Sequence, residues 1–94
     1  MAKITKPFSI TAHEAGFTAG VYTWNIFGDP CEHAETIEEA KTIAKTMFET
    51  KGERIVAVRI GFKPFKTKPG TEHYVKREDM HMLEPGLKIP ALAA

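Results

Sequence analysis

The residues best suited to binding a metal ion stand in one short segment ahead of a predicted helix. Cys31, Glu32 and His33 follow one another, and Asp29 lies two positions before them. Proteins use thiol, imidazole and carboxylate groups to hold zinc, but zinc signatures pair cysteines and histidines at fixed spacings. Because the chain has a single cysteine, we predict exposed loop residues here and no metal site.

The groups that build enzyme active sites are scarce in this chain. Cys31 has His33 as a neighbouring base, yet the carboxylates around it favour the neutral thiol over the reactive thiolate. The sequence contains one serine, one asparagine and no glutamine, so few hydroxyls and amides are present to orient a substrate. The seven glycines stand singly, and no phosphate-binding glycine motif occurs. These observations predict a non-enzymatic protein with no catalytic residue and no cofactor.

Charge is distributed unevenly along the chain, although it nearly cancels in total. Lys and Arg number 13 and Asp and Glu number 12, which gives a net charge of +1 and excludes both an acidic DNA mimic and a histone-like protein. Residues 29–39 contain five acidic and no basic side chains, whereas residues 54–68 contain five basic and no acidic ones. The acidic segment fits a solvated loop that leads into a helix N-terminus. The basic segment is the stronger candidate for a binding surface.

Aromatic side chains alternate with the basic ones around a predicted turn at residues 68–71. If this turn is a two-residue loop, Phe65 lies opposite Tyr74 and Lys63 lies opposite Lys76. A basic, aromatic β-ribbon suits a nucleic acid or an acidic protein groove. In the alternative interpretation, the two aromatic side chains pack together and the lysines protect an exposed strand edge. The candidate binding residues are Arg59, Lys63, Phe65, Lys66, Lys68, Tyr74, Lys76 and Arg77.

One amphipathic helix is expected from Ile37 to about Thr50. Thr36 fits the N-cap position, and Glu39 completes a capping box with it. Gly52 suits a helix end in the left-handed region. Apolar residues recur at helical spacing and define the buried face: Ile37, Ala40, Ile43, Ala44, Met47 and Phe48. The opposite, solvent-exposed face is expected to carry Glu38, Lys41, Thr42, Lys45 and Glu49.

A period-two pattern before the helix predicts a first β-hairpin. Residues 8–12 and 17–27 are the expected strands, and residues 13–16 are the expected turn. The segment Gly28-Asp29-Pro30 is expected to end the second strand, because proline cannot donate to a β-ladder. One face of this strand is expected in the core and consists of Tyr22, Trp24 and Ile26.

A second hairpin is predicted after the helix. Residues 55–62 alternate as a strand with one apolar face, residues 68–71 have the composition of a type II turn, and residues 72–77 form the fourth strand. The residues that follow either extend this strand or begin a short packing segment; they include Met80, Met82 and Leu83.

This order of elements predicts an α+β fold. We expect a two-layer ββαββ domain, in which an antiparallel sheet carries one helix (about residues 36–51) on one face. Whether the two hairpins share one sheet stays open. Residues 1–83 are expected to form a single domain, followed by an extended, proline-containing tail at residues 84–94. This tail either covers an open sheet face or docks on a partner.

The cellular compartment is predicted from cysteine usage and from the absence of long apolar runs. A single cysteine cannot form an internal disulfide, which fits a reducing environment. The sequence contains neither the apolar core of a secretory signal nor the run of about 18–20 apolar residues that a membrane helix needs. We therefore expect a cytoplasmic protein that is not inserted in a membrane.

A helix-then-strand segment resembles part of a known family. The residues that carry the resemblance are Ala34-Glu35-Thr36-Ile37-Glu38-Glu39-Ala40-Lys41-Thr42-Ile43-Ala44-Lys45, followed by Ile55-Val56-Ala57-Val58-Arg59-Ile60. This stretch, about 25 of the 94 residues, resembles small phage-encoded anti-CRISPR proteins directed against type I-F systems. The resemblance implies a non-catalytic inhibitor in the host cytoplasm. It also implies, as partner, a host protein or ribonucleoprotein complex whose nucleic-acid channel is blocked.

These sequence features fit three functions. The first is a small non-enzymatic binding or inhibitor protein that uses the basic aromatic hairpin against a host nucleic-acid-handling complex. The second is a module that binds DNA or RNA directly through the same residues. The third is a structural or assembly protein of a virion, which would form a homo-oligomer through its apolar tail and sheet edges.

Overall fold

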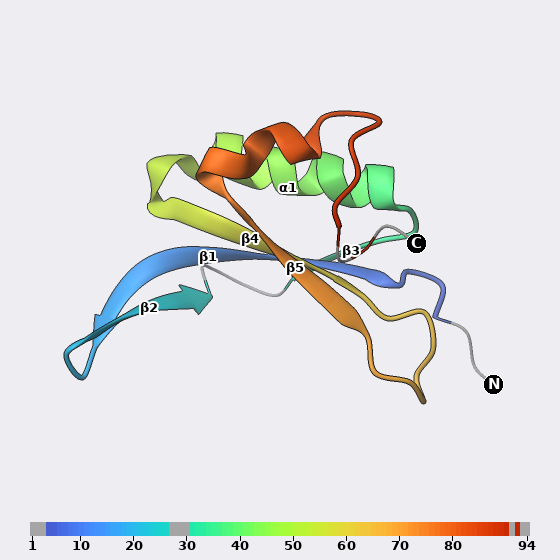
Figure 1. Cartoon of the computed structure of the whole chain (residues 1–94), viewed down its shortest axis with the longest axis horizontal. Helices are drawn as coiled ribbons and strands as arrows, with labels where there is room; N and C mark the ends of the chain where they lie inside the picture. The colour runs from blue at the N-terminus through green and yellow to red at the C-terminus, as the bar shows by residue number, and fades with distance from the viewer. Residues whose placement is uncertain (1–3, 27–30, 91, 93–94) are drawn as a thin grey trace.

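The structure, a computed structural model, describes residues 4–26, 31–90 and 92 of the chain (Figure 1). Eight elements follow one another: β1 (Phe8–Thr18), β2 (Val21–Ile26), β3 (Glu32–Ala34), α1 (Ile37–Lys51), the 3₁₀ turn η1 (Gly52–Arg54), β4 (Ile55–Phe62), β5 (Thr71–Lys76) and the 3₁₀ segment η2 (Arg77–Leu83). The predicted α+β class, with one main helix on an antiparallel sheet, is confirmed.

A single antiparallel sheet joins the two hairpins, in the order β2-β1-β4-β5. β1 is long enough to pair with two short strands along one edge: its start pairs with β3 and its second half with β2. β4 pairs along the other edge of β1, with Ile10 opposite Ile60 and Ala12 opposite Val58. β3 adds one strand to the predicted ββαββ order, and it contains residues that we had expected in a loop.

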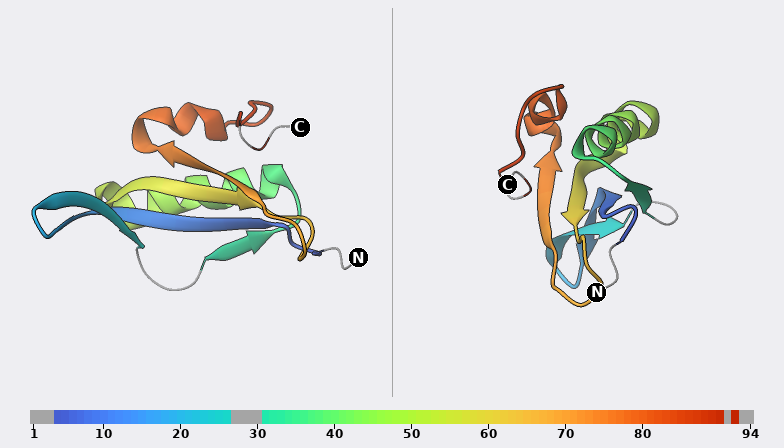
Figure 2. Two further views of the ribbon diagram at one scale, coloured as in Figure 1. Left: turned by 60° about the horizontal axis from the view of Figure 1, so that its bottom comes forward. Right: turned by 90° about the vertical axis from the view of Figure 1, so that its right-hand side faces the viewer.

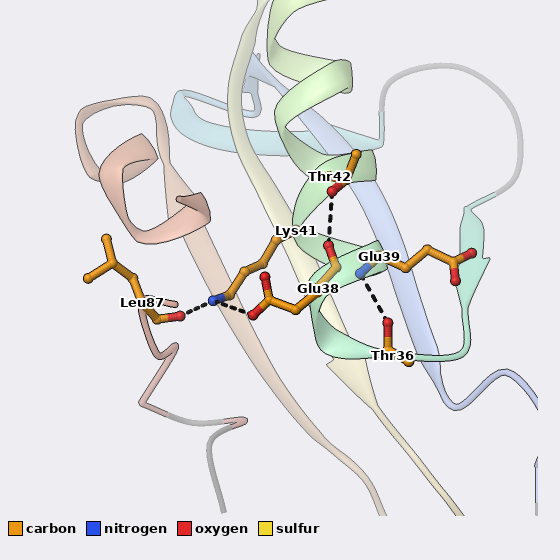
Figure 3. Close-up of polar contacts among 6 residues, drawn as sticks. All are labelled: Thr36, Glu38, Glu39, Lys41, Thr42 and Leu87. Carbon is orange, nitrogen blue, oxygen red and sulfur yellow. Dashed lines mark hydrogen bonds and ion pairs between the residues drawn. The ribbon is translucent and has the colours of Figure 1, made fainter. Parts of the chain in front are cut away.

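The helix α1 begins and ends where its capping residues predict. The Thr36 side chain accepts a hydrogen bond from the Glu39 backbone N–H at 3.2 Å (Figure 3). Gly52 follows the last turn with φ 68°. Glu38 and Glu39 lie in the first turn and Lys51 in the last, so these charges interact favourably with the helix dipole. The capping residues therefore fix both ends of the helix that covers the sheet.

Removing the N-cap hydroxyl by Thr36→Ala is expected to lower the free energy of unfolding by about 1 kcal/mol, because one helical N–H loses its acceptor. Thr46→Ala is a matched control. The Thr46 hydroxyl donates back to the Thr42 carbonyl within the helix, an arrangement that contributes little stability. Urea denaturation of both variants measures the difference. Equal losses at the two positions would contradict a capping role for Thr36.

The first hairpin turns later than predicted. Residues 13–16 continue β1, and the turn lies at Ala19 and Gly20, whose φ angles are 52° and 80°. Two consecutive positive φ angles are typical of a type I′ turn, whose twist matches that of paired strands. Alanine rarely adopts this conformation, so composition favoured Gly16 as the turn residue instead. The expected strand end at Gly28-Asp29-Pro30 lies outside the described residues.

Two residues of β2 that were expected in the core are exposed. Tyr22 and Ile26 are 85% and 60% exposed, and the side chain of Trp24 lies outside the part of the chain whose side chains are described. The reason is geometric: the β1–β2 hairpin extends past the end of α1, so the helix does not reach it (Figure 1 and the left view of Figure 2). The β1–β2 ladder runs from the His13–Ile26 pair to the Thr18–Val21 pair, so it continues up to the turn at Ala19-Gly20.

The core lies between the sheet and a helical layer that consists of α1 and η2, which lie on the same side of the sheet (Figure 2). The residues after β5 form η2 and pack against this core. Of the two expected possibilities for this segment, a strand extension and a short packing segment, the second is therefore confirmed. Ile89 is 1% exposed and belongs to the same core, which brings part of segment 84–94 onto α1. The largest fully buried side chains are Phe48, Ile10, Ile55, Ile60, Ile89, Val58 and Val75.

Lys41 is buried rather than exposed, in contrast to the helical-face prediction. Its side chain reaches under the C-terminal segment, where the ammonium donates to the Leu87 carbonyl and lies 3.5 Å from a Glu38 carboxylate oxygen (Figure 3). Only 2% of the residue is exposed. A lysine on the polar face of a helix becomes buried here because a distant segment packs over it.

Candidate binding surface

The β4–β5 hairpin does not have the register expected from a two-residue turn. Tyr74 lies opposite Arg59, Lys76 lies opposite Ala57, and the last pair of the ladder is Phe62 with Thr71. The connection is an eight-residue loop, residues 63–70, which we call the basic loop. Pro64 and Pro69 both lie in it, and prolines cannot donate to a ladder. The expected pairing of Phe65 with Tyr74 and of Lys63 with Lys76 is therefore wrong.

The basic loop is anchored to the rest of the fold by backbone contacts. The Lys63 N–H donates to the Pro7 carbonyl and the Ile4 N–H donates to the Pro64 carbonyl, both at 2.9 Å. Gly70 packs against the start of the loop: a Cβ added there would lie 2.5 Å from the Phe62 carbonyl oxygen. The close approach of the two ends of the loop thus requires glycine, and the N-terminal segment braces one side.

Lysine side chains project from this loop. Lys63, Lys66 and Lys68 are all exposed, and the Lys68 ammonium lies 5.3 Å from the centre of the half-buried Phe65 ring. None of the three forms an ion pair with a described residue. Other basic side chains do have carboxylate partners; the ion pairs are Lys41–Glu38, Lys45–Glu84, Arg54–Glu14 and Arg59–Glu72. The positive charge of the basic loop is therefore left uncompensated within the described fold.

Arg59 and Tyr74 lie on the sheet face that points away from α1. Val58 and Ile60 point into the core, so the alternation along β4 places Arg59 on the opposite face. The Arg59 guanidinium lies 3.8 Å from a Glu72 carboxylate oxygen. Tyr74 is 37% exposed, and its ring lies 5.5 Å, centre to centre, from the buried ring of His13. This face combines a compensated arginine with an accessible aromatic ring.

A shallow groove separates this pair from the basic loop. Its lining includes Ser9, Gly61, Lys63, Gly70, Thr71 and Glu72. The hydroxyl of Ser9 lies 2.8 Å from the position that a Cβ on Gly61 would take, so glycine is needed for Ser9 to lie against β4. The groove therefore offers one ammonium, hydroxyl groups, backbone groups and the Glu72 carboxylate, which lies 3.8 Å from the Arg59 guanidinium. No sequence motif marks this groove, because its residues come from three separate strands and from the basic loop.

Arg77 faces a different part of the molecule. Its guanidinium donates to the carbonyls of Ile55 and Gly52 and lies 5.2 Å from the centre of the Phe48 ring. These contacts satisfy backbone carbonyls where α1 ends and β4 begins. Lys76 is exposed, but five residues of β5 separate it from the basic loop, a length of about 17 Å. The eight candidate residues thus divide into a loop group, a sheet pair and two separate positions.

The residues considered for metal binding do not gather into a site. Cys31 Sγ lies 3.9 Å from His33 Nε2, and no group of three possible ligands occurs among the described residues. Asp29, the remaining member of that set, lies outside them. Lys6, which sequence reasoning did not single out, precedes the proline that accepts the Lys63 N–H, so it flanks the basic loop.

No helix in the described part of the chain combines the length and the apolar character needed to cross a membrane. Nothing in the geometry described above points to an enzymatic activity. No family model, curated protein or solved structure matches this chain.

Proposed function

We propose that the chain is a small, non-enzymatic binding protein of the cytoplasm whose basic loop binds a nucleic-acid backbone. The observation that carries the proposal is the set of three exposed lysines without carboxylate partners among the described residues. Elsewhere, the buried Lys41 and the half-buried Lys45 and Arg59 lie beside carboxylates, and the half-buried Arg77 donates to backbone carbonyls. A cluster of uncompensated ammonium groups is the electrostatic feature that phosphate backbones bind, since each contact releases a condensed counterion.

The surroundings of the loop favour a nucleic acid over an isolated anion. The groove beside Lys63 offers hydroxyls and backbone groups, which bind phosphate oxygens without reading sequence, and its one carboxylate, Glu72, lies beside the Arg59 guanidinium. Beyond it, Tyr74, which is 37% exposed, provides an aromatic ring on which a base can stack. The nucleic acid is either free or held inside a host ribonucleoprotein complex, and the second case is the inhibitory role implied by the anti-CRISPR resemblance.

The first test measures binding of a fluorescent single-stranded oligonucleotide at several salt concentrations. The triple variant Lys63→Ala, Lys66→Ala, Lys68→Ala is expected to bind roughly 100-fold more weakly at ~50 mM salt. The slope of log affinity against log salt is expected to become shallower by about 2, because each lost phosphate contact contributes about 0.7. The matched control is Lys45→Ala, Lys51→Ala, Lys88→Ala, which removes the same charge elsewhere on the surface.

Equal losses of oligonucleotide affinity in the two triple variants would show a general effect of charge and would contradict a site at the basic loop. Absence of oligonucleotide binding by the wild-type protein at ~50 mM salt would contradict direct binding. Affinity capture from host lysate then separates the remaining cases. A complex that is captured only without nuclease contains the nucleic acid as ligand, whereas nuclease-resistant capture that the loop variant abolishes indicates an acidic protein groove.

A further inference from the structure

The β1–β2 hairpin carries a surface that the proposed function does not use. Among the described residues β2 pairs only with β1, so its outer edge is a row of backbone groups without a neighbouring strand. Natural proteins protect such edges with lysines, prolines, bulges or a covering segment. The strand Val21–Ile26 contains no charged residue and no proline, and its β1 pairing has no bulge.

The sequence of this hairpin is neutral in an otherwise charged chain. Residues 15–26 contain no Lys, Arg, Asp or Glu, although these types make up 27% of the whole sequence. A neutral edge offers nothing to attract an acidic or a basic partner, and it places no like charges opposite each other when it pairs with itself. Its charge pattern therefore fits a second copy of the same strand.

The turn fixes which residues offer their backbone groups to this second copy. In the type I′ turn at Ala19-Gly20, Thr18 and Val21 are the outer residues, which form the hydrogen-bonded pair that closes the hairpin. Hydrogen-bonded and non-hydrogen-bonded pairs alternate along an antiparallel ladder. The backbone groups of Tyr22, Trp24 and Ile26 consequently point away from β1, toward the open edge.

We propose that the protein forms a two-fold symmetric dimer through antiparallel pairing of β2 with β2 of a second copy. Pairing of all three outward residues places Trp24 on the two-fold axis and Tyr22 opposite Ile26 of the second copy. These two side chains lie on the same sheet face and are 85% and 60% exposed, so each covers the other's apolar surface in the dimer. The hairpin extends past α1, which leaves room for the second copy (Figures 1 and 2).

Light scattering coupled to gel filtration tests the dimer on the full chain. Wild-type protein is expected to have the mass of two 10.5 kDa chains at high concentration and to dissociate on dilution. The double variant Tyr22→Lys, Ile26→Lys places lysine opposite lysine twice across the two-fold axis, so one-chain mass is expected over the same dilution series. The variant Tyr22→Lys, Ile26→Glu places opposite charges there and is expected to restore the two-chain mass.

Both substituted positions are exposed, so the variants are expected to keep the wild-type circular dichroism spectrum. Leu87→Lys is the control, because it adds a charge at an exposed apolar residue remote from β2. A wild-type protein that is monomeric at every concentration would overturn the proposal. So would a Lys/Lys variant that stays dimeric, or a Lys/Glu variant that stays monomeric beside a dimeric wild type.

Discussion

Replacing Ile89 by alanine is expected to lower the free energy of unfolding by about 2–5 kcal/mol, a large part of the roughly 5–15 kcal/mol that holds a domain of this kind together. Ile89 is 1% exposed and belongs to the core under α1, although it lies five residues from the C-terminus. Truncation leaves a cavity there that the surrounding side chains fill only partly. Urea denaturation should show a lower midpoint with an unchanged slope.

Leu87→Ala is the matched control for this prediction. Leu87 lies two residues earlier in the same segment but is 43% exposed, so its truncation is expected to change stability by less than about 0.5 kcal/mol. Both variants keep the backbone carbonyl that accepts the Lys41 ammonium. If the two substitutions cost the same, the C-terminal segment does not pack on the core as the structure has it, and residues 84–92 behave as a detached tail.

The elements that local chemistry determines were predicted from the sequence. The helix is the best example: Thr36 and Gly52 define its ends, and its apolar face is encoded by spacing within one segment. The alternation of Val58 and Ile60 likewise identified β4 and its core face. The α+β class followed from these elements and their order, because few arrangements bury one helix face and four strand faces together.

Features that depend on distant segments could not be predicted in this way. The side chain of Lys41 is on the polar face of its helix, and only the return of Leu87 over it makes it buried. Arg77 looked like part of a basic surface, but its partners are the carbonyls of Gly52 and Ile55, about 25 residues earlier in the chain. Spacing along the sequence carries no information on such contacts.

The candidate site shows the same division between local and distant information. The basic segment was visible in the sequence as a run of residues with basic and no acidic side chains. Lys63, Lys66 and Lys68 do project from one loop. The predicted position of these lysines relative to Tyr74 was wrong. The register of a hairpin depends on the length of its loop, and this loop has eight residues instead of two. The structure therefore separates the loop, which carries the charge, from the sheet pair, which carries the aromatic ring.

Reversing the charge of the buried lysine by Lys41→Glu is expected to cost about 3–5 kcal/mol of folding free energy, because it buries a carboxylate without a compensating cation. The new charge would face the Leu87 carbonyl oxygen and the Glu38 carboxylate, the two acceptors that the ammonium now satisfies (Figure 3). Relief requires the segment around Leu87 to leave α1, and Ile89 then loses its place in the core. The substitution thus acts on the helix and on the C-terminal segment together.

Two further variants separate charge burial from loss of the lysine contacts. Lys41→Met keeps most of the side-chain volume and removes the buried charge, so its cost is expected to stay below about 1.5 kcal/mol. Lys45→Glu reverses a half-exposed lysine on the same helix, which pairs with Glu84 at 3.6 Å, and is expected to cost less than about 1 kcal/mol. Urea midpoints of the three variants rank these effects. A Lys41→Glu protein as stable as Lys45→Glu would mean that the C-terminal segment does not cover Lys41, since only burial distinguishes the two positions.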